Sequence, residues 1–561
     1  MGGPDQVIPI KPVNLRATPK GRGVDPQALA QVQSLLGDAP RRRDLLIEHL
    51  HRIQDRFGHL SAPHLAALAA ELRMAQSEVY EVASFYHHFD LVKEGAEAPA
   101  AITVRVCDSL SCEMAGAKSL LQRLPEVLGK DVRVIPAPCV GRCETAPAVI
   151  VHQHPVAHAT IERVQAAVKA KQTRCDTPKA INYARYRQSG GYQLIADCLA
   201  GKHTRDAITH IMEDSGLRGL GGAGFPAGRK WRLVAAEPGP HNMAVNIDEG
   251  EPGTFKDRWY LERDPHRFLE GMLVAAWCAG VGEIWIYLRD EYHGVRALLE
   301  RELAALKKNP PCALPPIHLR RGAGAYICGE ESAMIESIEG KRGMPRLRPP
   351  YVAQVGLFGY PTLEHNMETV YWVRDIVERG ASWFSRHGSN GRKGLRSFSV
   401  SGRVKKPGVH VAPAGITVRE LIDQYCGGMR DGHAFYAYLP GGASGGILPA
   451  SMGDIPLDFD TLQPYGCFIG SAAVVILSDQ DRAKDAARNL MRFFKDESCG
   501  QCTPCRVGTA KALALIEQPK WNQSLLAELS QAMVDASICG LGQAAPNPVQ
   551  CVIKYFPDEV A

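Results

Sequence analysis

Apolar side chains recur every three or four residues early in the chain, after a stretch rich in Pro, Gly, Lys and Arg over residues 1–25. This spacing, which places side chains on one face of a helix, is shown by Leu45, Leu46, Leu50, Ile53 and Phe57. Polar residues precede the apolar runs at Ser61 and at 75–78, as at helix starts. We expect a flexible N-terminus over 1–25 and a helical bundle over 26–95.

The pattern changes to a period of two at residue 102. Ile102, Val104 and Val106 alternate with polar residues, which indicates a strand that runs into Cys107. A helical stretch over 115–128 and apolar runs over 132–135 and 148–151 follow. Strand, helix, strand, strand within about 75 residues predicts a thioredoxin-like α/β domain over 96–170. Residues 171–182 are polar and are expected to be a linker.

Three further regions follow. Strand and helix patterns alternate over 183–395, which predicts a layered α/β domain. Short strands with many Gly and Pro turns over 396–480 predict a small, ubiquitin-sized β-rich domain. Residues 481–561 are helical in pattern. The predicted fold class is therefore multidomain α/β, with helical bundles at both ends.

Composition narrows the functional classes. The 561 residues are 45% hydrophobic, enough for several large cores, and the net charge of +5 is too mild to indicate nucleic-acid binding. The most apolar window, 271–288, contains Glu283 and two Trp, so no membrane span is expected. Sixteen cysteines without a secretion-like start indicate a reducing cytoplasm, where clustered thiols bind metal.

A cysteine triple near the C-terminus, Cys499, Cys502 and Cys505, has the two-residue spacing of a cubane iron–sulfur site. Zinc and a disulfide are the alternatives. Structural zinc usually shows two Cys-x2-Cys pairs, so the triple favours a [4Fe-4S] cluster. Thr509 stands where a compact ferredoxin run has its fourth ligand. The fourth thiolate must therefore come from elsewhere, and Cys539 and Cys551 are the candidates.

A second set of thiols, Cys107, Cys112, Cys139 and Cys143, forms two pairs at expected strand ends. Four thiolates suffice for a [2Fe-2S] cluster. Zinc and ordinary buried thiols are the alternatives, and structural zinc pairs are usually more tightly spaced. The scattered cysteines elsewhere are more typical of small core residues.

Two glycine-rich loops and an acidic turn are the remaining candidates for binding. Residues 219–224 read G-x-G-x-x-G, but a helix-like stretch precedes them, so they are not a dinucleotide fingerprint. Their glycines permit close approach to a phosphate or a flat ring, with Lys230 supplying charge. A second loop covers 322–331. The turn over 246–253 suits ribityl or ribose hydroxyls, a magnesium ion, or solvent.

Four ordered motifs, at 216–226, 246–253, 322–331 and 498–506, resemble the NADH-binding flavoprotein subunit of respiratory complex I. The resemblance covers 183–561, and 396–480 corresponds to its ubiquitin-like domain of the soluble-ligand-binding type. Residues 26–170 resemble the adjacent two-iron, thioredoxin-like subunit, here fused. Within this superfamily, 369–376, 440–449 and 465–471 are most similar to the diaphorase (beta) subunit of NAD-dependent molybdenum or tungsten formate dehydrogenase.

The resemblance implies FMN, NAD(H), a [2Fe-2S] and a [4Fe-4S] cluster as cofactors, with Cys539 as the fourth ligand of the latter. The implied FMN contacts are Gly219, Gly221, Gly222, Lys230, Asn246, Asp248, Glu249, Tyr326, Gly329, Glu330 and Asn366. The implied nucleotide contacts are Phe225, Lys230, Glu251, Glu331 and Tyr351. The chain departs from the family at Leu220, Leu233 and His365. These departures concern the contacts with the nucleotide.

The resemblance implies an NADH:acceptor oxidoreductase that passes formate-derived electrons from a large pterin-containing (alpha) subunit to NAD⁺. It needs no acid–base residue, because hydride passes directly between nicotinamide and flavin. A diaphorase of an NAD-linked hydrogenase, or a fused complex I module, is an alternative within the same class. A cluster-carrying assembly protein is the alternative that is not an enzyme.

Overall fold

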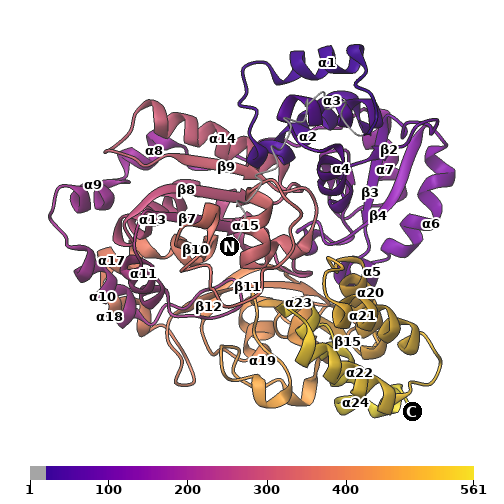
Figure 1. The fold of residues 1–561 in the computed structure, drawn as a ribbon. Helices are drawn as coiled ribbons and strands as arrows, with labels where there is room; N and C mark the ends of the chain where they lie inside the picture. Colours follow the sequence, from indigo (N-terminus) through magenta and orange to yellow (C-terminus); the bar gives the residue numbers. More distant parts are fainter. Residues whose placement is uncertain (1–20) are drawn as a thin grey trace, which may run out of the picture.

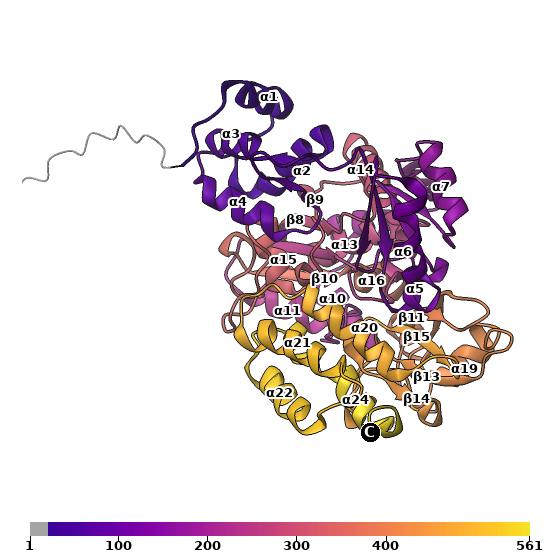
Figure 2. The ribbon, with the colours of Figure 1, turned by 90° about the vertical axis from the view of Figure 1, so that its right-hand side faces the viewer.

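The computed structural model describes residues 21–561 (Figure 1). Of the stretch expected to be flexible, residues 1–25, the first twenty lie outside the described residues. The view turned by 90° shows the N-terminal and C-terminal helices at opposite ends of the molecule, with an α/β domain between them (Figure 2). The predicted multidomain α/β fold class is confirmed.

The N-terminal bundle consists of α1 (Pro26–Leu36), α2 (Leu46–Phe57), α3 (Ala62–Leu72) and α4 (Gln76–Phe85). Leu46, Leu50 and Ile53 are fully buried, as their spacing predicts. Two short parallel strands, β1 (Leu60–Ser61) and β2 (Leu91–Val92), close the bundle.

Side chains define the helix starts in this bundle. Ser61 caps α3, since its hydroxyl accepts the His64 N–H at 3.3 Å. The polar cap expected at α4 is wrong in detail. Ala75 occupies the cap position, and the Glu78 carboxylate accepts the Ala75 N–H at 3.4 Å instead.

The thioredoxin-like sheet has the strand order β4-β3-β5-β6. Its elements are β3 (Ile102–Cys107), α5 (Leu110–Met114), α6 (Ala117–Leu128), β4 (Val132–Ala137), β5 (Val149–Val151), β6 (His154–Val156) and α7 (Ile161–Lys169). The helix expected over 115–128 is α6, and the shorter helix α5 precedes it. They separate at Gly116, whose φ of 95° is a conformation that glycine adopts at little cost.

The central domain is built on a parallel sheet in the order β10-β7-β8-β9. The strands are β7 (His241–Ile247), β8 (Val281–Leu288), β9 (Ile317–Arg321) and β10 (Thr362–Asn366). The helices are α8 (Tyr183–Gln188), α9 (Gln193–Leu199), α10 (Arg205–Ser215), α11 (Ala227–Ala236), α12 (Lys256–Leu261), α13 (Pro265–Cys278), α14 (His293–Lys308), α15 (Glu331–Ile338), α16 (Met367–Tyr371), α17 (Val373–Arg379) and α18 (Ala381–Ser385). The apolar window 271–288 forms the end of α13 and strand β8 in the core.

The β-rich domain holds a mixed sheet in the order β12-β11-β15-β13-β14. Its elements are β11 (Leu395–Gly402), β12 (Gly408–Pro413), α19 (Val418–Glu420), β13 (Phe435–Leu439), β14 (Leu448–Pro449) and β15 (Ala473–Ser478). β11 pairs antiparallel with β12 and parallel with β15. Within the described residues no helix is long and apolar enough to cross a membrane.

The C-terminal bundle comprises α20 (Ala483–Asp496), α21 (Thr503–Ile516), α22 (Gln523–Ala536), α23 (Gly540–Ala544) and α24 (Asn547–Tyr555). Both ribbon views place α20 beside α5 of the thioredoxin-like domain (Figures 1 and 2). Asn489 of α20 donates to the Asp108 carbonyl at 2.8 Å and to the Glu113 carboxylate at 2.6 Å. The C-terminal helices thus contact the thioredoxin-like domain directly.

Candidate functional site

A cavity of about 700 Å³ opens at the carboxyl edge of the central parallel sheet, where ligands of open α/β sheets bind. The structure brings all but one of the predicted FMN and nucleotide residues to its wall. These are Gly219, Gly221, Gly222, Phe225, Lys230, Asn246, Asp248, Glu249, Glu251, Tyr326, Gly329, Glu330, Glu331 and Asn366. Tyr351 is not in the lining and is 56% exposed, so its role stays a prediction.

The first glycine loop follows α10, a helix, as the sequence indicates, and leads into α11. Gly222 (φ 127°) and Gly224 (φ 66°) adopt positive φ, which residues with a Cβ rarely tolerate. Leu220 anchors the loop, because its N–H donates to the Thr369 hydroxyl at 2.9 Å. The loop therefore presents bare backbone to the cavity, with Lys230 of α11 beside it.

The acidic turn is fixed by its own hydrogen bonds. Asn246 accepts the Asp248 N–H and donates to the Gly329 carbonyl, both at 2.9 Å, which joins this turn to the second glycine loop. The Glu249 carboxylate accepts the Asp257 N–H at 2.8 Å and the Tyr292 hydroxyl at 2.7 Å. Burial raises the pKa of Glu249 to about 7. These bonds hold the turn against the sheet edge.

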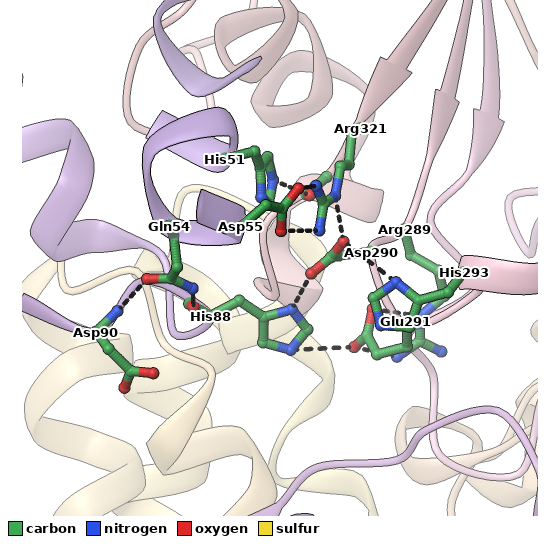
Figure 3. A network of polar contacts seen from close by, with 11 residues as sticks. His51, Gln54, Asp55, His88, Asp90, Arg289, Asp290, Glu291, His293 and Arg321 are labelled. Atoms are coloured by element: carbon green, nitrogen blue, oxygen red, sulfur yellow. Dashed lines mark hydrogen bonds and ion pairs between the residues drawn. The ribbon is translucent and has the colours of Figure 1, made fainter. Parts of the chain in front are cut away.

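The second glycine loop is held from outside by the N-terminal bundle (Figure 3). The His88 N–H donates to the Ala323 carbonyl at 3.1 Å, and the His51 ring lies 2.8 Å from the Gly322 carbonyl. The His88 ring also contacts Asp290 at 2.8 Å, and it leaves no room for a Cβ at Gly324. Because these partners lie far apart in the chain, single-sequence reasoning missed them.

Carboxylates of the cavity are mostly matched by partners. Glu251 accepts the Ser444 N–H at 2.8 Å and the Tyr326 hydroxyl. Glu330 and Glu331 both pair with Arg348, a lining residue that the sequence analysis missed. Arg348 therefore offsets the negative charge that two adjacent glutamates place at the cavity wall.

A buried lysine, also missed, lies at the floor of the cavity. Lys256 is 1% exposed, and its Nζ lies 2.8 Å from Asp257, 3.1 Å from Asn366 and 3.1 Å from Glu368. Burial opposes its charge, but Asp257 and Glu368 outweigh burial and raise its pKa. In the sequence Lys256 begins a charged run, 256–258, and such a run is typical of a solvated helix start.

Glu364 and His365 of β10 are further lining residues. The His365 Nε2 accepts the Trp231 indole N–H at 2.7 Å, so this nitrogen carries no proton. Glu364 is 6% exposed, one of its oxygens has no hydrogen-bond partner, and burial raises its pKa to about 8. His365 was noted as a departure from the family, whereas Glu364 was not singled out.

The four N-terminal thiols come together beyond the carboxyl ends of β3 and β4, with Cys107 closing β3 and Cys112 in α5. All are at most 3% exposed: Cys107, Cys112, Cys139 and Cys143. Cys139 and Cys143 have sulfurs 3.3 Å apart, and Cys107 is within hydrogen-bond reach of both Cys112 and Cys139. Hydrogen bonds from Cys107 and Cys143 lower the pKa of Cys139, which favours its thiolate.

The C-terminal thiols line one small cavity formed by Cys499, Cys502, Cys505 and Cys539 with Ile327 and Pro345. Cys502 caps α21, Cys505 lies in its first turn, and Cys539 caps α23. Cys551 lies elsewhere, with its sulfur 3.5 Å from that of Cys467. The geometry selects Cys539 over Cys551 as the fourth member of the set.

The residues present fit the predicted cofactors. Among residues 21–561 no group of three His, Cys, Asp or Glu side chains that could hold a single metal ion is found. Each set supplies the four thiolates that an iron–sulfur cluster requires. The large cavity combines bare glycine backbone, a lysine and buried polar groups without partners at Asp248 and Glu364.

Comparison with known proteins agrees with this arrangement. Family models match for a thioredoxin-like [2Fe-2S] ferredoxin (32–172), the Nuo51 FMN-binding domain (212–375), the SLBB domain (397–448) and the NADH-ubiquinone oxidoreductase-F iron-sulfur binding region (485–561). The chain is therefore an iron–sulfur flavoprotein, with FMN, [2Fe-2S] and [4Fe-4S] as its cofactors.

The relatives define its family. The second of two F-type NADH-quinone oxidoreductase subunits in Rhizobium meliloti (strain 1021) is 39% identical over 68% of this chain and 94% of its own length. The corresponding F-type protein of Aquifex aeolicus (strain VF5) is 38% identical over 69% and 92%. The chain belongs to the family of F-type NADH-quinone oxidoreductase subunits. A chain of the NAD⁺-reducing [NiFe]-hydrogenase in the H2-reduced state is 32% identical with a TM-score of 0.80, covering 93% of this chain and 92% of that one.

Proposed function

We propose that this protein is the diaphorase subunit of a cytoplasmic NAD-dependent formate dehydrogenase, which delivers formate-derived electrons from a molybdenum- or tungsten-pterin subunit to NAD⁺. An electron-transfer role is supported by one observation, namely that the large cavity reaches the surroundings of both thiol sets. On one side its wall includes Gly540, the residue after Cys539 of the C-terminal thiol set. On another side it includes Lys256, the residue after Phe255. Phe255 in turn packs on Cys139 and Cys143 of the N-terminal thiol set. One FMN-sized space thus adjoins both thiol sets.

The formate assignment is supported by the segments that resemble formate dehydrogenase. Residues 440–449 and 465–471 contribute Ser444, Phe468, Gly470 and Ser471 to the cavity. These segments therefore touch the space where the cofactor and nucleotide bind, rather than a remote surface. FMN, when bound, exchanges a hydride with NAD(H) and single electrons with clusters.

The chain's own residues have defined tasks in this scheme. Backbone at Gly221 and Gly222 admits a phosphate or a ring at close range, and Lys230 supplies positive charge. Arg348 and Lys256 balance the carboxylates, so a negatively charged nucleotide can approach. The Glu251–Ser444 bond joins the α/β and β-rich domains across the cavity mouth.

The hydrogenase-type diaphorase is the second candidate, because a chain of the NAD⁺-reducing [NiFe]-hydrogenase matches this protein over both fused halves. The two candidates differ in the partner and its metal. They share the same cofactors within this chain.

The deciding experiment is purification of the native complex through a tag on this chain. We expect a pterin subunit with molybdenum or tungsten and formate-dependent reduction of NAD⁺. The isolated chain should reduce dyes with NADH and should not oxidise formate. Nickel with H2-dependent reduction of NAD⁺ would establish the hydrogenase type, and formate oxidation by the isolated chain would contradict either type.

A further inference from the structure

A second cavity, of about 240 Å³, lies on the other side of the first glycine loop from the large cavity. It is walled by the start of that loop, by the segment 384–396 and by the β-rich domain. Gly216, Leu217 and Leu220 line it, whereas Gly219, Gly221 and Gly222 line the large cavity. One loop thus separates two cavities.

Positive side chains dominate this second cavity. Its wall contains four cations, Arg218, Arg392, Lys393 and Arg396, and a single carboxylate, Asp458. Asp458 is shared, since it pairs with Arg392 at 2.8 Å and with Arg396 at 2.7 Å. Asp460, outside the wall, pairs with Arg218. Four cations against these two carboxylates leave two positive charges without a counterion.

One of these cations is buried with an unused donor. Arg396 is 3% exposed, and its Nε–H has no hydrogen-bond partner. Burial lowers the pKa of Arg396 in spite of Asp458, as expected where a single carboxylate serves two arginines. Within residues 21–561 no carboxylate pairs with Lys393, which is exposed at the rim. A buried donor without an acceptor points to a ligand.

We propose that this cavity binds a small dianionic oxyanion, phosphate or a phosphomonoester, between the α/β and β-rich domains. Guanidinium forks match the tetrahedral oxygens of phosphate, and two charges would be neutralised. The ring of Phe459 forms an apolar floor on which Arg218 (4.5 Å) and Arg396 (4.2 Å) stack, which presets both guanidinium groups.

The same residues couple this anion site to the large cavity. Phe459 packs so closely on Gly224 that a Cβ there would come within 2.6 Å of the ring. Arg218 donates through Nε to the Gly224 carbonyl. Gly224 and Phe225 line the large cavity. An anion that binds the Arg218 guanidinium therefore shifts the loop that faces the nucleotide. Binding of phosphate and of NAD⁺ should therefore alter each other's affinity by the same factor.

The first test is calorimetric titration of the cofactor-loaded protein with inorganic phosphate, at an ionic strength held constant with chloride. We expect saturable binding. Lys393→Gln and Arg392→Gln should each weaken it roughly tenfold, the worth of one charge-assisted contact. Lys405→Gln, which changes an exposed lysine of the β-rich domain outside the cavity, should not. Lys393→Gln removes an exposed side chain, so loss of fold does not confuse the result.

Absence of saturable phosphate binding, or equal binding by the Lys393→Gln and Lys405→Gln proteins, would overturn the proposal. Glycerol phosphate should compete if the site accepts phosphomonoesters, whereas competition by phosphate and sulfate alone would restrict it to inorganic anions. Coupling is tested by the Kd for NAD⁺ with and without saturating phosphate, and Phe459→Leu should abolish the difference. These titrations involve no formate, so their failure is distinguishable from failure of the proposed function.

Discussion

The two cysteine sets differ in how they meet their surroundings. The N-terminal set is at most 3% exposed and lies at the carboxyl end of a small sheet, with Cys139 and Cys143 packed on Phe255 of the central domain. In the C-terminal set Cys499 and Cys502 are half-buried, and the thiols sit at helix starts within a larger core. The C-terminal set, called the outer set below, therefore lies nearer to solvent, whereas the N-terminal set, called the inner set, is enclosed by the chain itself.

The largest effect is expected from Cys505→Ser, which breaks the outer set. A serine oxygen is a poor ligand for iron, so the protein should lose roughly four iron atoms and the matching sulfide while retaining FMN. Metal and flavin analysis and low-temperature electron paramagnetic resonance measure this. Cys551→Ser is the matched control, because that thiol lies outside the small cavity. Loss of the four-iron cluster in the control would refute the assignment of Cys539.

Cys139→Ser breaks the inner set and should have the next largest effect. We expect loss of roughly two iron atoms, with the four-iron cluster and FMN retained, because the two sets belong to separate hydrophobic cores. Iron analysis and visible spectra measure the result, with Cys198→Ser as a buried-thiol control. Simultaneous loss of both clusters would show that the two regions fold as one unit.

The same contrast shows what sequence alone can supply. The strand ending at Cys107, the N-terminal thiol set and the triple Cys499, Cys502 and Cys505 follow from local alternation and spacing, whereas Cys539 followed from the family resemblance. The short helix α5 was not predicted, because five residues are too few for a helical repeat to show in the pattern. Lys256 and Glu364 were missed for another reason. A charged residue in one sequence reads as solvated, and only the tertiary fold shows that these two are buried.

Contacts between domains could not be predicted from the sequence either. His88 presses on Gly324 and contacts Asp290, and no local pattern relates these three residues. The residues at such interfaces are polar and look like surface in isolation. The proximity of the two thiol sets to one cavity is likewise a property of the assembled fold.

Arg258→Met would test how the chain encloses the inner set, and we expect a moderate effect on stability. The Arg258 Nε donates to the Gly141 carbonyl at 2.9 Å, and its other nitrogens pair with Glu144 and Glu262. Removing it leaves the part-buried Glu144 carboxylate unpaired and leaves Glu262 only the longer contact with Arg142 at 3.9 Å, so stability should fall by about 2 kcal/mol. Denaturant unfolding measures this, and a chelator should remove the inner iron faster. Arg419→Met, on an exposed pair with Asp454, should cost under about 0.5 kcal/mol.

The last prediction concerns the pH dependence of stability and the cavity between the sets, through Glu364. Its pKa is raised from 4.5 to about 8, so between these values the folded FMN-free protein holds a proton that the unfolded chain has released. Stability contributed by this group should then fall as pH rises, by at most about 1.4 kcal/mol per pH unit, and level off above pH 8. Glu364→Gln, which cannot ionise, should remove this slope. Denaturant unfolding of both proteins from pH 5 to 9 measures the difference. Parallel pH profiles would mean that Glu364 is ionised in the folded protein, balanced by Lys230, and that the cavity carries one more negative charge than inferred.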